Sequence, residues 1–268
     1  RWHHTATVTG AQYQQLSDQH RLIADVVAFK GPHINHLTPR TLDIDQVQAA
    51  MPGKGITPKA VIEGPPRRQC PILLRQTSFK ALDEAIAFTD AQGSHSARFG
   101  EIEQRGVALT PKGRALYDQL LNAARDELGA FPNESNAAHY MHLMEQHFQA
   151  FPDNHDQMRE QGLAYFRYFA TPKGLAARGH ADQPRTLQAL IAAGHVDVEP
   201  LVYEDFLPVS AAGIFQSNLG DAAQSHYAAQ SNQAQFEEAL GRRTIDELQL
   251  YGETQQRSMD ACTQALLA

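Results

Sequence analysis

Cysteine is nearly absent from the sequence, since Cys70 and Cys262 are the only two among 268 residues. Two cysteines cannot form the disulfide framework on which small secreted domains depend, and we find no secretory signal. We therefore expect a reducing, cytoplasmic environment. Long apolar stretches are missing too, because no run approaches the roughly 20 residues that a membrane-spanning helix needs. No membrane partner is expected.

Positive charge is also scarce. Lysine and arginine number 23 against 30 aspartates and glutamates, which gives a net charge of -7. Nucleic acids and anionic membranes attract proteins with the opposite balance, so neither is expected as a partner. What the sequence does contain is typical of a globular protein, with 42% hydrophobic and 20% charged residues. The length suffices for one large domain or two small ones.

The spacing of apolar residues divides the chain into three regions. Residues 1–30 predict a helical lead-in, residues 31–110 predict a mixed unit of strands and helices, and residues 111–268 are rich in helix. Within the last region we expect a helix over residues 156–171 and an apolar, glycine-bearing loop over residues 200–220. The pattern as a whole predicts an α+β fold.

Three helices in this pattern have recognisable ends. Asp43 or Asp45 is a candidate N-cap for the first. The second is predicted over residues 79–93, an amphipathic stretch that ends at a glycine. The third begins after Thr110, a good N-cap residue, with Pro111 at its first position.

One predicted strand carries an unusual number of charges. The stretch RFGEIEQRG, residues 98–106, contains four charged side chains. Side chains alternate along a strand. This alternation places on one face Phe99, Glu101, Glu103 and Arg105. Such a row is either a solvated face or the lining of a polar cavity that holds a metal. Arg105 is expected to pair with Glu103 or to orient Glu101.

Two histidines near the start of the mixed unit are candidate metal ligands. His33 and His36 lie three residues apart, so an unbroken strand would send them to opposite faces. Two histidines and one carboxylate form the triad of non-haem Fe(II) oxygenases. Glu101 on a second strand could complete such a set, although the spacing alone is weak evidence.

Two short motifs resemble known metal-dependent enzymes. The opening strand and helix of the vicinal-oxygen-chelate superfamily are similar to INHLTPRTLDID, residues 34–45. The glutamate strand of hydroxyphenylpyruvate dioxygenases resembles FGEIEQRG, residues 99–106. In those enzymes the glutamate at the position of Glu101 binds iron.

A more specific resemblance extends from residue 29 to residue 220. The chain is similar there to the 2-oxoadipate dioxygenase/decarboxylase family, also called 2-hydroxyglutarate synthase. The segments that carry the resemblance are FKGPHINHLTPRTLDID, VIEGPPRRQCPILLRQTSFKAL, ARFGEIEQRGVALTPKGRALYD and YEDFLPVSAAGIFQSNLG. The resemblance implies a vicinal-oxygen-chelate-like mixed β-sheet, a partly closed barrel, with a helix-rich C-terminal region.

The resemblance also implies an activity and its residues. Members of the family use Fe(II), held by two histidines and a glutamate, to convert 2-oxoadipate and O2 into 2-hydroxyglutarate and CO2 in lysine breakdown. Glu101 matches the carboxylate ligand, and either His33 or His36 matches a histidine ligand. Val209 and Ser210 match positions that contact the 2-oxo acid.

The family has a further N-terminal region, which we do not find in this sequence. It carries another histidine ligand and an arginine for the substrate. We interpret the start at Arg1, without methionine, as processing or as a piece of a longer protein, and expect an N-terminal segment as a partner. Arg67, Arg68 and Arg75 could bind a dicarboxylate. Two alternatives stay open: a metal-dependent hydrolase or lyase using Zn or Mn, and a non-catalytic binding module.

Overall fold

In the N-terminal half of the computed structural model helices come first and four strands follow them, and helices are more frequent in the second half. The residues that it describes are 5–19, 24, 27–29, 38–59, 61–80, 84–95, 99–130, 135–204, 237, 238, 240–243 and 245–267. The helices among them are α1 (Gly10–Gln19), α3 (Ile44–Ala50), η3 (Pro52–Lys54), α4 (Pro111–Leu128), α5 (Ala137–Phe148), α6 (His155–Glu160), α7 (Pro172–Ala176), α8 (Leu187–Ala192) and α11 (Glu247–Leu267). The strands are β1 (Leu74–Lys80), β2 (Glu84–Ala87), β3 (Gln92–His95), β4 (Phe99–Arg105), β5 (Phe166–Ala170) and β6 (Val196–Pro200).

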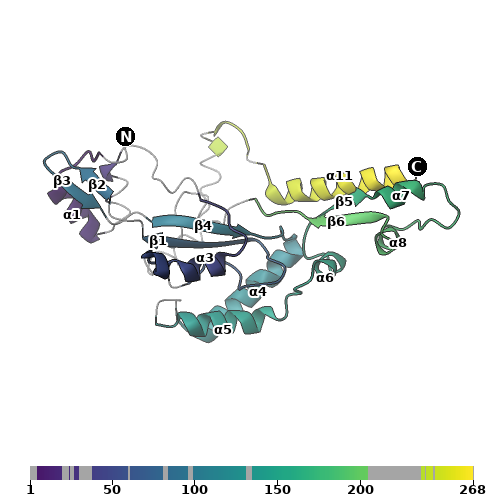
Figure 1. Cartoon of the computed structure of the whole chain (residues 1–268), viewed down its shortest axis with the longest axis horizontal. Helices are drawn as coiled ribbons and strands as arrows, with labels where there is room; N and C mark the ends of the chain where they lie inside the picture. The colour runs from purple at the N-terminus through teal and green to yellow at the C-terminus, as the bar shows by residue number, and fades with distance from the viewer. Residues whose placement is uncertain are drawn as a thin grey trace.

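These elements form three groups along the long axis of the molecule (Figure 1). The β1–β4 pair lies in the middle, with α3, α4 and α5 on one side of it in this view. At one end α1 lies beside the β2–β3 pair, and at the other α11 lies beside β5 and β6. Among the described residues, no helix has the length and apolar character needed to cross a bilayer.

The capping signals in the sequence correctly mark two helix starts. The Asp43 side chain accepts a hydrogen bond from the Gln46 backbone N–H at 3.0 Å, which selects Asp43 over Asp45 as the N-cap of α3. The Thr110 hydroxyl accepts from the Gly113 backbone N–H at 3.1 Å, and α4 begins at Pro111. Each cap satisfies a backbone donor that the first helical turn leaves free.

The helix predicted over residues 79–93 is wrong, because its described part forms the antiparallel β2–β3 pair. Alanine and glutamate favour a helix in this stretch, but packing decides the outcome. Ile86 is fully buried among apolar side chains of the N-terminal region. The ring of Phe88 lies 5.5 Å from that of Tyr13. Pairing two short strands lets both side chains reach this cluster.

The central pair β1–β4 is antiparallel, with Ser78 opposite Glu101. Flanking segments add isolated bridges on both sides, from Pro58 and Glu63 to β1 and from Arg40 to β4. These segments contain Pro39 and Pro58, and a proline has no N–H with which to extend a ladder. The described strands therefore stay in two-stranded sheets and do not close into a barrel. The expected α+β mixture is confirmed, whereas the expected partly closed barrel is not seen in this part of the chain.

The C-terminal region is rich in helix, as expected, but it also contains a sheet. The helix predicted over residues 156–171 is only half correct, since α6 is followed by strand β5. β5 pairs with β6 in antiparallel fashion, and α11 packs on β5. Buried side chains from α4, α5, β5 and α11 join one large hydrophobic cluster.

Candidate functional site

One face of the central sheet is polar and yet buried. Strand alternation and the β1–β4 register place on this face Gln76, Ser78, Glu101 and Glu103. Each of the four exposes only 4% of its surface. Of the two interpretations of the charged strand, a solvated face is therefore wrong, and the row of charges lines the interior.

Glu103 has all the partners that a buried carboxylate needs. Its Oε1 accepts from the Nε of Arg105 at 2.7 Å and from the Nε of Arg40 at 3.2 Å. Its Oε2 accepts from the Nη2 of Arg105 at 3.2 Å. Arg105 thus pairs with Glu103, one of the two roles expected for it. Arg40 reaches further and forms an ion pair with Glu204, whose Oε2 lies 2.5 Å from its Nη2.

Glu101 lies two residues along the same strand and has no positive partner among the described residues. Its Oε2 accepts from the Nε2 of Gln76 at 3.1 Å. Its Oε1 is buried and has no hydrogen-bond partner in the described part of the chain. Burial raises the pKa of Glu101 to about 8, the charges of Glu63 and Glu103 act in the same direction, and hydrogen bonds from Gln76 and Thr38 oppose them.

This environment fits a metal ligand. An unpartnered carboxylate oxygen in a buried, acidic surrounding lacks a positive charge, and a divalent cation would supply it. Within the described residues, no three His, Cys, Asp or Glu side chains gather closely enough to hold a metal ion. Glu101 therefore needs ligands from elsewhere. His33 and His36 lie outside the described residues, as do Val209 and Ser210.

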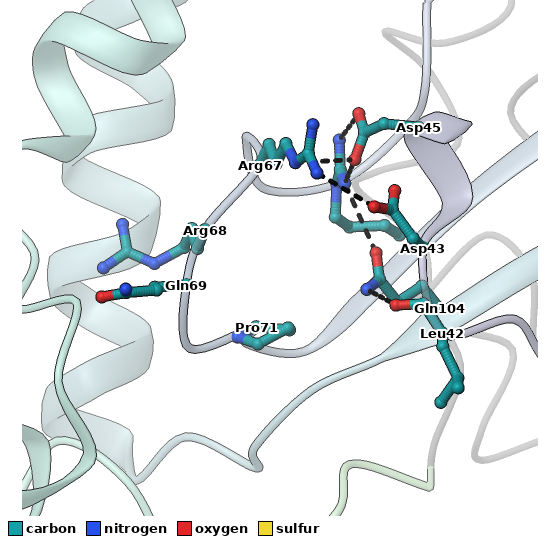
Figure 2. Close-up of a pocket in the computed structure, with 9 residues that line it drawn as sticks. Leu42, Asp43, Asp45, Arg67, Arg68, Gln69, Pro71 and Gln104 are labelled. Atoms are coloured by element: carbon teal, nitrogen blue, oxygen red, sulfur yellow. Dashed lines mark hydrogen bonds and ion pairs between the residues drawn. The ribbon is translucent and has the colours of Figure 1, made fainter. Parts of the chain in front are cut away.

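The opposite face of the sheet contains a cavity of about 160 Å³, between the start of α3 and the segment before β1 (Figure 2). Arg75 is committed to internal partners there: its Nη1 and Nη2 contact Asp45 at 2.5 and 2.9 Å, and its Nε donates to the Pro65 carbonyl. Arg67 donates to Asp43 at 2.9 Å. These pairings leave little capacity for a dicarboxylate, so the substrate role considered for the arginines is not favoured.

Arg68 has a structural role. Figure 2 shows its side chain turned away from the two aspartates. Its guanidinium donates to the backbone carbonyls of Phe148 at 3.3 Å, Phe151 at 2.9 Å and Pro152 at 2.7 Å. It also lies over the Phe151 ring, 5.2 Å from the centroid. Arg68 thus binds the C-terminal end of α5 to the segment that precedes β1.

Sequence reasoning missed the neighbours of Glu101. Gln76 and Thr38 contact its carboxylate, and neither belongs to a recognisable ligand motif. Gln76 does offer one signal, because it is a polar side chain within the predicted strand ILLRQTSF. A buried polar residue in a strand calls for a hydrogen-bond partner, and this requirement points to the neighbouring strand.

Comparison with known proteins defines the class to which this fold and this site belong. The model of the 2-oxoadipate dioxygenase/decarboxylase family matches residues 1–218. The chain belongs to this family.

Individual relatives are similar over nearly the whole chain. The 2-oxoadipate dioxygenase/decarboxylase of Pseudomonas putida is 69% identical, and the alignment covers 99% of this chain and 58% of the relative. That of Escherichia coli is 57% identical, covering 98% of this chain and 57% of the relative. The chain thus spans little more than half the length of these relatives.

Two solved structures are also similar to this chain. The crystal structure of the Pseudomonas putida hydroxyglutarate synthase in complex with 2-oxoadipate superposes with a TM-score of 0.83 at 65% identity, covering 99% of this chain and 58% of that one. An uncharacterised protein from Shigella flexneri gives a TM-score of 0.75 at 50% identity, covering 98% of this chain and 56% of that one.

Proposed function

We propose that this chain forms part of an Fe(II)-dependent dioxygenase that converts 2-oxoadipate and O2 into 2-hydroxyglutarate and CO2, a reaction of lysine breakdown. Family membership supports the reaction, and the related hydroxyglutarate synthase was crystallised with 2-oxoadipate. The observation that carries the proposal is the free Oε1 of Glu101, a buried carboxylate oxygen without a partner among the described residues. Glu101 lies on the strand that resembles the glutamate strand of hydroxyphenylpyruvate dioxygenases.

Glu101 would hold the iron together with one of two histidines, His33 or His36. On an unbroken strand only one of them could face Glu101, and the other would then have a packing role. A further histidine ligand and a substrate arginine are proposed to come from a segment outside these 268 residues. When bound, iron would supply a Lewis acid for the 2-oxo acid and the redox chemistry of O2.

We also propose that Val209 and Ser210 contact the 2-oxo acid. The last described residues before them are fixed next to β4, which supports this assignment. The Tyr203 carbonyl accepts from Arg105 at 2.9 Å, and the Glu204 N–H donates to the hydroxyl of Tyr251 at 2.8 Å. The chain therefore enters this segment beside the polar face of the sheet.

The fold and its boundaries complete the proposal. A strand pair with a helix on one face and a carboxylate on the other supports a relationship to the vicinal-oxygen-chelate fold. We propose residues 31–110 as the metal-binding unit, residues 1–30 as a lead-in, and residues 111–268 as a region that covers the substrate through its loop 200–220.

The experiment is to measure iron content and 2-oxoadipate-dependent O2 uptake for the wild-type protein, Glu101→Gln and Glu199→Gln. Glu199 is an exposed glutamate on β6 and receives the same chemical change. We expect Glu101→Gln to abolish iron binding and O2 uptake, because a neutral amide binds a hard cation weakly. Glu199→Gln should behave as wild type. Loss of 2-oxoadipate without O2 consumption would favour the hydrolase or lyase alternative and overturn the proposal.

A further inference from the structure

The backbone of Gln76 is held by neighbouring segments on both sides. On one side Gln76 exchanges two backbone hydrogen bonds with Glu63, at 2.8 and 3.0 Å. On the other side it lies opposite Glu103 in the β1–β4 pair. A side chain that starts from such a position has little freedom to move away. Its Nε2 donates to the Oε2 of Glu101 at 3.1 Å.

We propose that Gln76 is a positioning residue for the metal ligand, an inference that rests on the proposed function. A metal-bound carboxylate is negatively charged, so Gln76 must turn its NH2 group, and not its carbonyl, toward Glu101. This hydrogen bond occupies Oε2 and leaves Oε1 as the oxygen that binds the metal. Gln76 would thus leave Glu101 one oxygen, and not two, with which to hold the cation.

The carbonyl oxygen of the Gln76 side chain supports a role beyond packing. Gln76 Oε1 is buried and, like Glu101 Oε1, has no hydrogen-bond partner among the described residues. A residue that only filled space here would be more stable as a hydrocarbon, since an unpaired buried acceptor is unfavourable. Both unpartnered oxygens belong to one hydrogen-bonded pair. When a metal is bound, Oε1 of Gln76 would be available to accept a hydrogen bond beside Glu101.

The first test is the affinity of the protein for Co2+, an air-stable probe for the iron site. Gln76→Leu and Gln76→Met remove the amide and keep most of the volume. We expect both to bind Co2+ about 10- to 100-fold more weakly, the usual effect of losing a partner of a metal ligand. Two substitutions are used so that a folding defect in one does not decide the result, and thermal unfolding identifies such a defect.

Thr77→Val is the matched control. Thr77 is the next residue on β1, equally buried, and its side chain points to the other face. Its hydroxyl also lacks a partner in the described part of the chain. Thr77→Val should therefore leave the affinity for Co2+ unchanged. An equal loss of affinity in Thr77→Val would mean that any disturbance of β1 weakens the site, and would overturn the positioning role.

A double-mutant cycle separates positioning from general stability. If Gln76 acts through Glu101, Gln76→Leu should weaken Co2+ binding in the wild-type background and have little further effect in the Glu101→Gln background. Infrared difference spectra provide the structural readout. Metal binding through one oxygen separates the two carboxylate stretching bands more widely than binding through two, so Gln76→Leu should narrow this separation.

The outcomes also distinguish this inference from the function on which it rests. The measurements use the protein together with the segment proposed to supply the further histidine. If that wild-type protein binds no Co2+, or its Glu101→Gln variant binds Co2+ as well as wild type, the metal site itself is wrong. If Glu101→Gln loses Co2+ while both Gln76 variants retain wild-type affinity and infrared bands, only the positioning role is wrong.

Discussion

The two faces of the β1–β4 pair both bury charged side chains, but only the face opposite α3 leaves one of them, Glu101, without a positive partner among the described residues. On the face toward α3, Arg75 and Asp45 share two hydrogen bonds of 2.5 and 2.9 Å. On the other face Glu101 has only neutral donors, Gln76 at 3.1 Å and Thr38, and its Oε1 has no partner among the described residues. The strands are the same, so the difference lies in what each face is built to hold.

A satisfied buried charge contributes to the fold, whereas an unsatisfied one lowers stability and is kept for another reason. The α3 face should therefore respond to mutation with a change in stability. The Glu101 face should respond with a change in metal binding. The following experiments test this division, from the largest expected effect to the smallest.

Arg75→Met should lower the free energy of unfolding by about 3 kcal/mol, because it leaves Asp45 without its ion-pair partner. Urea denaturation measures this change. Arg67→Met is the control, since Arg67 lines the same cavity but its side chain is 62% exposed, and exposed pairs contribute about 0–1 kcal/mol. Affinity for Co2+ should stay at the wild-type level in both variants. A loss of affinity in Arg75→Met would contradict the division between the faces.

Asp45 gives the α3 face a defined pH dependence. Burial acts to raise the pKa of Asp45, but hydrogen bonds and charge from Arg75, aided by Arg67, prevail and hold it below its ordinary value of 3.8. The stabilisation is therefore complete above the unfolded pKa and is lost as pH falls through the folded pKa. Asp45→Asn should lower the free energy of unfolding by about 2 kcal/mol at pH 7. The difference in unfolding free energy between the variant and wild type should disappear below about pH 4. A difference that does not change with pH would show that the Arg75–Asp45 pair is not its source.

Glu101→Gln should raise the free energy of unfolding when no metal is present, whereas the two preceding substitutions lower it. Burial raises the pKa of Glu101 to about 8, so the metal-free protein pays to keep this carboxyl in the fold at neutral pH. A neutral amide of the same size avoids that cost, so the metal-free protein should gain about 1 kcal/mol of unfolding free energy. Denaturation in the presence of a chelator measures the gain. A loss of stability would show that Glu101 has a structural partner outside the described residues.

Thr77→Val should have the smallest effect. Thr77 faces α3, and its buried hydroxyl is the exception to the satisfied character of that face. Valine has the same shape without the hydroxyl, so we expect a gain of about 0.5 kcal/mol. A destabilised variant would indicate that the hydroxyl does have a partner, and would make the contrast between the two faces sharper.

Some of this structure could be predicted from the sequence. The caps at Asp43 and Thr110 act within one helical turn, so their residues are sufficient to mark the helix starts. The alternation along β4 correctly placed Glu101 and Glu103 on one face, because it follows from strand geometry alone.

The rest depends on contacts between distant residues. Residues 84–95 form strands because Ile86 and Phe88 pack against the N-terminal cluster, and local propensity contains no information about that cluster. The pairing of Gln76 with Glu101 depends on the register between β1 and β4. The free oxygen of Glu101 depends on burial, which no spacing of residues reveals.

Arg68 has a consequence for local unfolding of the protein. Its hydrogen bonds to the end of α5 connect the segment before β1 with the α4–α5 pair, and its side chain is only 4% exposed. β1, α4 and α5 also share the large hydrophobic cluster. Backbone amides in these three elements should therefore exchange with deuterium as one cooperative unit, since none can separate without exposing the guanidinium's partners. β1, which carries Gln76, would then stay folded when other parts of the protein unfold locally.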